Sequence, residues 1–468
     1  MISILLCFLS GLLATLSFPG FSLSYLVWIS LVFYFAALYG AKTYKESILY
    51  GFVFGAAYFG GVFYWLTSTS RWVGIAGYLA WAGLALYQSI FIILFSYFAW
   101  LIIKYSHKQI HTAALPSLWI FFEWLRQAGE FGSPGGYLGN TQYLNTALIQ
   151  IADFSGVWGV SYLIVSVNLI IALLLLQRGN ILKRIVSLAA PLSLVCVLLA
   201  ASYSYGIVSL KKERGSAFIN KTTIAIVQPS VPQEVKLDPR NLYPTLDRLL
   251  SLTKSSFPNK PEIVIWPETA VMTYLEDDKA ALLKVKRMCE EGKVFLICGA
   301  FYRKDGKIYN SVFSISPTGE TVSRYDKHHL MPFGEYLPFK AVFYPFLKST
   351  GFFDQDQSQG TGSAMINAAG RSIGTMICFE SLFEELGKER AKNADLLLTL
   401  TNDAWFGKSL AAEQHISAGV FRAIENRKYF IQSANTGITA VIDPRGRFIK
   451  KSRLNREEVI IFDLSGSK

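Results

Sequence analysis

The chain has 468 residues, of which 52% are hydrophobic and 17% are charged, and its formal net charge at pH 7 is +12. The lysines and arginines are dispersed along the chain without a nucleic-acid-binding motif, so we exclude nucleic acid as a partner. Near a membrane, a basic surface would instead attract anionic phospholipid head groups, each nearby Lys or Arg contributing about 1 kcal/mol.

The first half of the chain, residues 1 to about 210, is apolar and aromatic and contains very few acids. We predict that it forms a bundle of transmembrane helices. A spanning helix needs roughly 17 to 25 apolar residues. Stretches of about this length lie at 2–18, 22–40, 47–67, 77–103, 157–177 and 185–208. No basic start precedes the first stretch and further apolar stretches follow it at once, so we interpret it as a retained signal anchor.

A seventh apolar stretch, 113–126, is short and carries Glu123, so it is compatible with a tilted span, a re-entrant segment or a helix lining a polar cavity. Short cytoplasmic loops are rich in Lys and Arg. The loop charges follow this rule when 113–126 is counted as a span. With seven spans and a cytoplasmic N-terminus, the inner loops contain Lys42, Lys45, Lys104, Lys108, Arg178, Lys183 and Arg184, and the outer loops contain little beyond Arg71 and Arg126. An odd number of spans places the second half of the chain in the periplasm.

A polar segment with Gly and Ser, 211–221, follows the last apolar stretch. We predict that it links a membrane domain, 1–210, to a second domain, 222–468. In the second domain short β-rich runs such as IAIVQ alternate with helical, charge-bearing runs such as KAALLKVKRMCEEG, and this alternation predicts an α/β fold. We interpret Cys289 and Cys298 as core thiols, and a disulfide between them stays open as an alternative.

Two charged residues follow strand-like runs of the second domain. In EIVIWPETA, Pro267 ends the strand and leaves Glu268 where a general base could stand. Lys327 follows the strand-like TVSRY, and Glu335 lies in a Gly- and Pro-containing loop that could fold back over a site. Taken singly, Glu268 is also compatible with a surface turn and Lys327 with a solvated lysine.

Cys378 lies in GTMICFES, where a β-branched apolar run turns into a helix. A thiol at such a turn projects into a pocket, and the next backbone N–H, that of Phe379, points at any oxyanion that forms there. An isolated cysteine is more often a buried core residue. Because Glu268 and Lys327 also follow strand-like runs, we interpret Cys378 as a nucleophile instead.

In this chain order, Glu268, Lys327 and Cys378 resemble the catalytic triad of the nitrilase (carbon-nitrogen hydrolase) superfamily. The resemblance extends to YNS at 309–311, TNDAWFG at 401–407 and RAIENRKYFIQSANTG, and covers about 222–464. It implies a four-layer α-β-β-α sandwich and a thioester on the cysteine. It also implies that Glu268 deprotonates the thiol and that Lys327 stabilises the tetrahedral intermediate.

A nitrilase-like domain behind a multi-span bundle resembles the apolipoprotein N-acyltransferase family of the bacterial inner membrane. That family has a loop near its active site comparable to EFGSPGGYLGNTQY, 130–143. The resemblance implies that a phospholipid such as phosphatidylethanolamine donates a fatty acyl chain to Cys378, which passes it to the α-amino group of a diacylglyceryl-cysteine at a lipoprotein's N-terminus. No metal or organic cofactor is needed, and we expect a monomer.

Further positions match the family's supporting residues. Glu335 and Glu380 would orient Lys327 or bond near Cys378, or else belong to structural ion pairs. Asn402 and Trp405 lie in one loop, where Trp405 is either a mobile lipid-facing arm or a core residue. We reject a metal site at His328 and His329, because adjacent histidines on a strand point different ways and no Cys/His/Asp set accompanies them.

The chain departs from the family at two places. Many members have Tyr after the nucleophile where this chain has Phe379, and well-known members have an additional C-terminal span for which we expect no room after EEVIIFDLSGSK. Two other functions remain open. A membrane-tethered amidase would use the same triad with water as the acceptor, and a transporter or lipid-binding module would have lost catalysis, which the presence of all three triad residues disfavours.

Overall fold

The computed structural model describes residues 1–177, 180–212, 221–348 and 356–464. The chain divides into two compact units, Met1–Lys211 and Lys212–Lys468. Most of the expected linker, residues 213–220, lies outside the described residues, as does Arg178, which was counted among the inner-loop charges.

All regular secondary structure in the described part of the first unit is helical. Long runs of Leu, Ala, Ile and aromatic residues without interior charges make helix formation favourable there, because each helix satisfies its own backbone hydrogen bonds. Its α-helices are α1 (Ile2–Leu16), α2 (Val27–Ser30), α3 (Val32–Gly40), α4 (Tyr44–Val62), α5 (Ser70–Val73), α6 (Ile75–Tyr105), α7 (Lys108–Leu125), α8 (Ala152–Leu176), α9 (Ile181–Ser187) and α10 (Ala189–Lys211). Its 3₁₀ helices are η1 (Ser24–Leu26), η2 (Tyr64–Thr69), η3 (Leu138–Gln142) and η4 (Leu148–Ile151).

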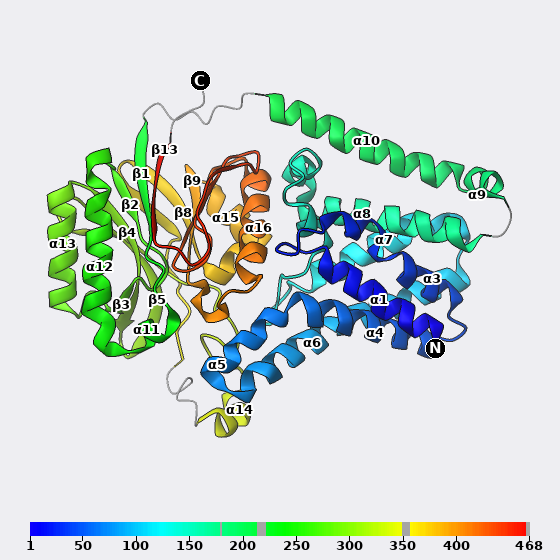
Figure 1. Ribbon diagram of the computed structural model, residues 1–468, viewed down its shortest axis with the longest axis horizontal. Coiled ribbons are helices and arrows are strands. Elements are labelled where there is room, and N and C mark those ends of the chain that lie inside the picture. The colour runs from blue at the N-terminus through cyan, green and yellow to red at the C-terminus, as the bar shows by residue number, and fades with distance from the viewer. Residues whose placement is uncertain (178–179, 213–220, 349–355, 465–468) are drawn as a thin grey trace. The chain divides into compact units, whose positions relative to one another are not determined.

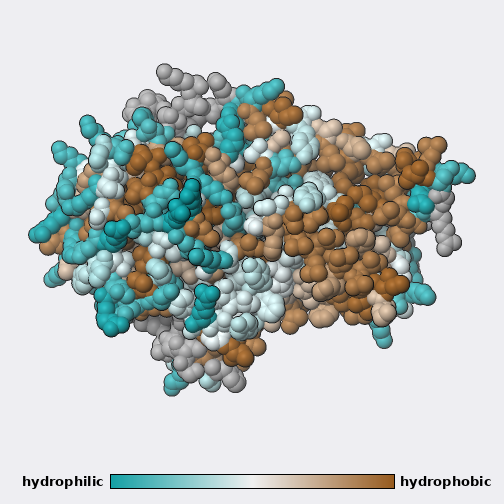
Figure 2. Space-filling view, in the orientation of Figure 1, coloured by the Kyte–Doolittle hydropathy of each residue, from teal (hydrophilic) through white to brown (hydrophobic). Residues whose placement is uncertain are grey.

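Three helical segments are long and apolar enough to cross a membrane, judged by length and composition over the described residues: α6, η4 with α8, and α10. A fourth is possible if α4 and the bent segment Tyr64–Val73, inclined by 55°, form one span. The apolar helices Ile2–Leu16 and Ser24–Gly40 are shorter. The first unit is therefore a helical membrane unit, with three or four such spans where we predicted seven. Figure 2 shows its surface covered mainly by hydrophobic residues.

Small residues allow two helices of this unit to pack closely. Gly51 and Gly55 of α4 face Ser96 and Ser89 of α6, and a Cβ atom added at Gly51 would lie 2.2 Å from Ser96 Oγ. Contacts of this kind stabilise helix association where lipid removes the hydrophobic driving force.

Glu123 and Arg126, at the end of α7, are buried and hold the loop that follows. The Arg126 guanidinium donates to the carbonyl oxygens of Gly135 and Gly136 at 2.9 Å each, and Glu123 Oε1 accepts the Leu138 N–H at 2.9 Å. Arg126, which we counted as an outer-loop charge, is thus an internal anchor of the 130–143 loop, with 2% of its surface exposed.

The second unit is an α/β domain with two β-sheets, as the alternating sequence pattern predicts. Its strands are β1 (Thr222–Gln228), β2 (Ile263–Ile265), β3 (Val271–Tyr274), β4 (Phe295–Lys304), β5 (Lys307–Ile315), β6 (Thr321–Asp326), β7 (Met365–Ala368), β8 (Arg371–Ile377), β9 (Leu396–Thr401), β10 (Phe430–Ala434), β11 (Ala440–Ile442), β12 (Phe448–Lys451) and β13 (Glu458–Leu464). One sheet has the order β13-β1-β2-β4-β5-β6, with β3 pairing with β4, and the other has the order β12-β11-β10-β9-β8-β7.

Helices cover the outer faces of both sheets, which gives four layers in the order α-β-β-α (Figure 1). The helices of this unit are α11 (Gln233–Leu237), α12 (Leu242–Ser255), α13 (Lys279–Gly292), α14 (Lys340–Leu347), α15 (Glu384–Ala391) and α16 (Ala411–Asn426), with η5 (Pro239–Asn241), η6 (Phe257–Asn259), η8 (Cys378–Leu382) and η9 (Asp403–Phe406). Of these, α12 and α13 cover one sheet, and α15 and α16 cover the other. One core fills the space between the sheets, from Ile224 and Ile265 to Leu398 and Ile431, and another packs the first sheet on α12 and α13. Cys289 and Cys298 are free thiols in that second core.

Strand direction brings several loops to one place. Strand β2 runs parallel to β4, β5 is antiparallel to both β4 and β6, and β8 and β9 are parallel. The carboxyl ends of β2 and β6 therefore lie at the same edge of the first sheet, and those of β8 and β9 at the same edge of the second. Ligand sites of α/β sheets lie at such edges.

Candidate active site

Cys378 lies on a sharp strand-to-helix turn, as its sequence context predicts. Strand β8 ends at Ile377, Cys378 has φ of +51°, and η8 begins at the same residue. A positive φ costs a non-glycine residue about 1–3 kcal/mol and persists only where surrounding contacts fix it. The carbonyl oxygen of Cys378 is fixed by Ser381 Oγ, which donates to it at 2.9 Å, and by His415 Nε2 at 3.1 Å.

Glu268 lies in the loop after β2 with 7% of its surface exposed. Its Oε1 accepts from Asn310 Nδ2 at 2.7 Å, and its Oε2 accepts from the backbone N–H of Asn402 at 2.8 Å. Burial raises the pKa of this carboxyl, and the charge of Glu335 raises it further against the opposing effect of Lys327. A carboxylate with a raised pKa is a stronger base, which suits proton abstraction.

Lys327 directly follows β6, and its ammonium is 2.9 Å from Glu335 Oε1. Burial on its own lowers the pKa of Lys327, but the charges of Glu335 and Glu268 outweigh burial and raise it. Lys327 therefore stays protonated. The Glu335 loop folds back over the site as we expected, and Met331 N–H fixes the other carboxylate oxygen of Glu335 at 2.8 Å.

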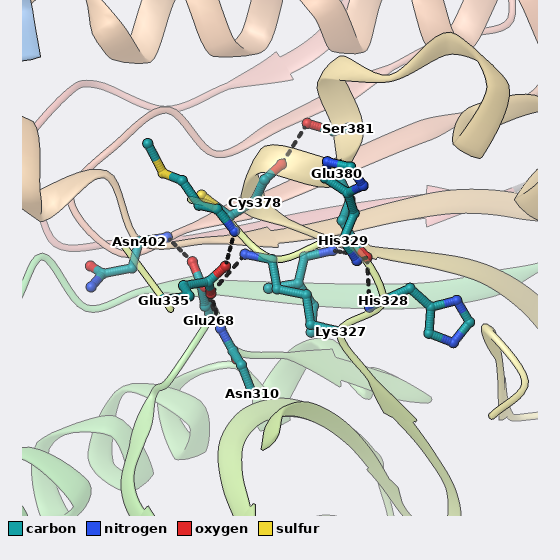
Figure 3. A network of polar contacts seen from close by, with 12 residues as sticks. Glu268, Asn310, Lys327, His328, His329, Glu335, Cys378, Glu380, Ser381 and Asn402 are labelled. Atoms are coloured by element: carbon teal, nitrogen blue, oxygen red, sulfur yellow. Dashed lines mark hydrogen bonds and ion pairs between the residues drawn. The ribbon is translucent and has the colours of Figure 1, made fainter. Parts of the chain in front are cut away.

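The four side chains gather in one place: Figure 3 shows Cys378 beside Glu268, Lys327 and Glu335. Burial raises the pKa of the Cys378 thiol well above its ordinary value, Glu268 raises it further, and Lys327 lowers it. The resting cysteine is consequently a thiol with a carboxylate base and a cation at hand. This arrangement can deprotonate a nucleophile and stabilise an oxyanion without another group.

Glu380 forms no ion pair with Lys327, but its hydrogen bonds connect the loop of Lys327 to the loop of Cys378. Its fully buried carboxylate accepts the N–H groups of His328 and His329 at 2.9 Å each, of Ile377 at 2.7 Å, and the hydroxyl of Tyr325 at 2.7 Å. These donors flank Lys327 on one side and Cys378 on the other. Of the roles we considered for the two glutamates, Glu335 has the contact that orients Lys327 and Glu380 has the one that fixes the backbone (Figure 3).

The remaining predicted residues surround the same site. The ring of Phe379 packs against Phe383, with centroids 5.1 Å apart, and its N–H belongs to the first turn of η8, where backbone donors have no partner within the helix. Asn402 donates its side-chain amide to Gln233 Oε1 at 3.1 Å and accepts from Asn435 Nδ2 at 2.9 Å. Trp405 is half-buried in η9, and its suggested mobility stays a prediction.

Sequence reasoning missed several residues of this site. Asn310 lies in the YNS motif and Asn435 in the SANTG run, yet neither suggests a partner when seen in the sequence. Lys236 of α11 donates to the carbonyl and hydroxyl oxygens of Thr269, directly after Glu268, at 2.8 Å each. Asp403 and His415, which contact each other at 3.1 Å, lie behind Cys378. One signal in the sequence could have indicated such a residue: a polar side chain on an otherwise apolar helix face, such as His415 in α16.

Among the described residues, one group has the donor types of a metal site. Ligand atoms of Cys378, Asp403 and His415 lie within 4.8 Å of one another. Both ring nitrogens of His415 already contact oxygen atoms, so hydrogen bonding accounts for the grouping and we assign no metal to it. His328 and His329 point to different partners, His328 Nδ1 to Arg390 at 2.9 Å and the His329 ring to Phe383.

Comparison with known proteins identifies both halves of the chain. Residues 223–467 match the carbon-nitrogen hydrolase family, and residues 10–170 match the apolipoprotein N-acyltransferase N-terminal domain. The chain is 34% identical to the apolipoprotein N-acyltransferase of Geobacter metallireducens, over 97% of this chain and 88% of that protein. It is 28% identical to the enzyme of that name from Rickettsia typhi, over 96% of this chain and 90% of that protein.

A solved structure is also similar. It is a variant of an amidase of the nitrilase superfamily from Nesterenkonia, with 16% identity, a TM-score of 0.41, and coverage of 52% of this chain and 90% of that one.

Proposed function

The chain belongs to the apolipoprotein N-acyltransferase family, and we propose that it moves a fatty acyl chain from a phospholipid, through a thioester on Cys378, to the N-terminal amine of a diacylglyceryl-cysteine in apolipoproteins. The observation that carries the site assignment is the placement of Cys378 at a strained turn beside a buried carboxylate and a buried ammonium. We assign the catalytic roles to Glu268, Lys327 and Cys378.

The first half-reaction forms the thioester. Glu268 takes the thiol proton, and the Cys378 thiolate attacks the ester carbonyl carbon of the phospholipid. Lys327 and the Phe379 N–H stabilise the oxyanion of the tetrahedral intermediate. Its collapse breaks the ester bond, and the lysophospholipid leaves with the proton that Glu268 held.

The second half-reaction transfers the acyl chain to the amine. The neutral α-amino group of the diacylated lipoprotein attacks the thioester carbonyl, and Glu268 removes a proton from the attacking nitrogen. The C–S bond then breaks, an amide remains on the lipoprotein, and the proton returns to the Cys378 sulfur. Two half-reactions that share one covalent intermediate give ping-pong kinetics.

Other residues of the site support this chemistry. Glu335 holds the Lys327 ammonium, Asn310 and the Asn402 backbone hold the two oxygens of Glu268, and Glu380 fixes the backbone beside Lys327 and Cys378. We assign Trp405 to the substrate side of the site because it shares the loop of Asn402.

The membrane location that we propose follows from the fact that both substrates are lipids. We propose seven spans in the inner membrane, a cytoplasmic N-terminus, a periplasmic 222–468 domain and a monomer. The unequal loop charges support this topology, and the first unit contributes three or four helical segments long enough to span and two shorter apolar helices. Cysteine labelling with a membrane-impermeant maleimide, at single cysteines placed in successive loops, would test the topology. Labelling of residues 41–43, before α4, and of residue 74, between α5 and α6, from the same side would refute it.

Intact mass spectrometry after incubation with phospholipid alone tests the mechanism. We expect a mass gain of one acyl group, absent in Cys378→Ala and released by hydroxylamine or by a diacylated lipopeptide. An unmodified protein that leaves phospholipid intact but hydrolyses small amides would refute transfer and establish the tethered amidase. Cys289→Ala is the matched control, because it removes a thiol remote from the site and should keep the mass gain.

A further inference from the structure

A ring of polar residues lies behind the nucleophile turn, outside the Glu268, Lys327 and Glu335 cluster. It joins three segments that follow one another around Cys378: η8 through Ser381, the end of β9 with η9 through Thr401 and Asp403, and α16 through His415. Asp403 and His415 are 3% and 9% exposed, so both groups lie away from bulk water. None of the roles proposed above uses this ring.

The contacts of His415 fit a ring that carries a proton on each nitrogen. Nδ1 lies 3.1 Å from the carboxylate oxygen Oδ1 of Asp403, and Nε2 lies 3.1 Å from the carbonyl oxygen of Cys378. Carboxylate and carbonyl oxygens only accept hydrogen bonds, so a ring that bonds to both of them donates from both nitrogens. The Ser381 hydroxyl, 2.9 Å from Nε2, donates to the same carbonyl and can accept from Nε2. A ring that donates at both nitrogens is an imidazolium.

Electrostatics supports the same protonation state. Burial alone lowers the pKa of His415, but the charge of Asp403 and its hydrogen bond outweigh burial and raise it. Asp403 also acts on the nucleophile, because its charge raises the pKa of the Cys378 thiol. Glu268 raises the thiol pKa too, and Lys327 lowers it. A second uncompensated carboxylate behind the sulfur would therefore work against the thiolate that the reaction needs.

We propose that His415 is a positioning residue, which holds the nucleophile turn through the Cys378 carbonyl and, as an imidazolium, cancels the negative charge that Asp403 places beside the thiol. The inference rests on the proposed function for the role of Cys378 as the nucleophile. Asp403 in turn keeps His415 charged and, through Thr401 Oγ1 at 3.0 Å, connects the imidazolium to the end of β9.

Alkylation of Cys378 by iodoacetamide as a function of pH measures this charge balance without any acyl donor. The full-length protein is labelled in detergent, and peptide mass spectrometry follows Cys378 and the exposed Cys196 separately. Cys196 serves as an internal reference for thiol reactivity. The variants are His415→Gln, Asp403→Asn and the double variant, and thermal unfolding of each checks that it folds.

We expect His415→Gln to slow labelling of Cys378 at a fixed pH by about tenfold or more, because one unit charge stays uncompensated close to the thiol. Asp403→Asn should label at least as fast as the wild type, and the double variant should return to within about threefold of the wild type because it contains neither charge. Ser381→Ala, which removes a hydrogen bond to the same carbonyl without changing a charge, should leave the pH midpoint of labelling in place.

Several results would overturn the inference. A double variant as slow as His415→Gln would mean that packing, not charge, determines the rate. A Ser381→Ala midpoint shifted as far as that of His415→Gln would show that the carbonyl contact alone matters. If His415→Gln does not fold, slower labelling in Asp403→Asn than in the wild type refutes the charge balance. If the labelling rates of the three variants follow the expected pattern while phospholipid gives no acyl-enzyme, the inference stands and the proposed function fails.

Discussion

The ammonium of Lys236 lies 2.8 Å from both the carbonyl oxygen and the hydroxyl oxygen of Thr269, the residue that follows Glu268. Thr269 has φ of +46°, a strained conformation that these contacts help to maintain. Lys236 also acts electrostatically on Glu268, and burial lowers its own pKa to about 8. The turn after Glu268 is thus held by a residue 33 positions earlier than Thr269 in the chain.

Lys236→Met should slow thioester formation by about tenfold to a hundredfold, because a base displaced by a fraction of an ångström loses its alignment with the thiol. The measurement is the rate of acyl-enzyme formation from phospholipid by rapid-quench mass spectrometry. Lys254→Met is the matched control, since Lys254 forms an exposed ion pair with Glu291. Equal rates in Lys236→Met and the wild type would contradict the role of this turn.

Glu335→Gln should reduce acyl-enzyme formation by at least about tenfold, because Lys327 loses the carboxylate that orients it and the raised pKa that keeps it charged. The amide retains one oxygen for Lys327 but no acceptor for the Met331 N–H, so thermal unfolding of the variant is measured beside its activity. Steady-state kinetics should assign the loss to kcat, since the ammonium acts on the transition state. Glu385→Gln, at an exposed carboxylate, is the control. A change confined to KM would instead place Glu335 in substrate binding.

The rate of thioester formation should fall as the pH is lowered through the pKa of Glu268, which burial raises above 4.5. The carboxylate is the active form of the base, so activity is present above this pKa and lost below it. Lys327 causes no loss below pH 10.5, because its pKa is raised above that value and the ammonium persists. A pH profile of the pre-steady-state rate between pH 4.5 and 9 checks this prediction. A rate independent of pH across that range would exclude Glu268 as the base.

Glu380→Gln should destabilise the protein by about 2–3 kcal/mol, because the buried carboxylate accepts several hydrogen bonds and an amide group would direct N–H atoms at donors. Thermal unfolding, monitored by tryptophan fluorescence in detergent, measures the loss. Glu291→Gln is the comparison, because its exposed ion pair should contribute less than about 1 kcal/mol. Similar unfolding temperatures for the two variants would contradict a tie between the Lys327 and Cys378 loops.

Local pattern in the sequence predicts the elements of the second unit well. The run KAALLKVKRMCEEG is the whole of α13, and the strand-like runs before Glu268, Lys327 and Cys378 end close to where β2, β6 and β8 end. Short-range periodicity determines these elements, so a window of ten to fifteen residues contains the required information.

The contacts that complete the site could not be predicted in this way. Asn310 meets Glu268 across 42 positions and Asn402 meets it across 134, because strand order and direction bring them together. The seven expected spans differ from the three or four helical segments of spanning length for a related reason. Helix α1 has 15 residues and α7 contains Glu123, whose partner is the Leu138 N–H of a later loop. Composition does not identify that partner, so it cannot distinguish a span from a re-entrant segment or a helix that lines a polar cavity.

The close packing of α4 on α6 gives a prediction for the helical unit. Gly51→Ala should destabilise it by about 1–3 kcal/mol, because the added methyl group would lie 2.2 Å from Ser96 Oγ and 3.0 Å from the Ile92 carbonyl oxygen. That hydroxyl is itself held by hydrogen bonds to Tyr34 and Ile92, so it cannot simply turn away. Gly83→Ala, in α6, is the matched control. Nothing lies within 4 Å of its added Cβ, and replacing a mid-helix glycine should stabilise the helix by about 0.5–1 kcal/mol. Thermal unfolding of both variants in one detergent should therefore shift in opposite directions. Stabilisation by both variants would mean that helix propensity, and not contact between α4 and α6, governs the stability of this unit.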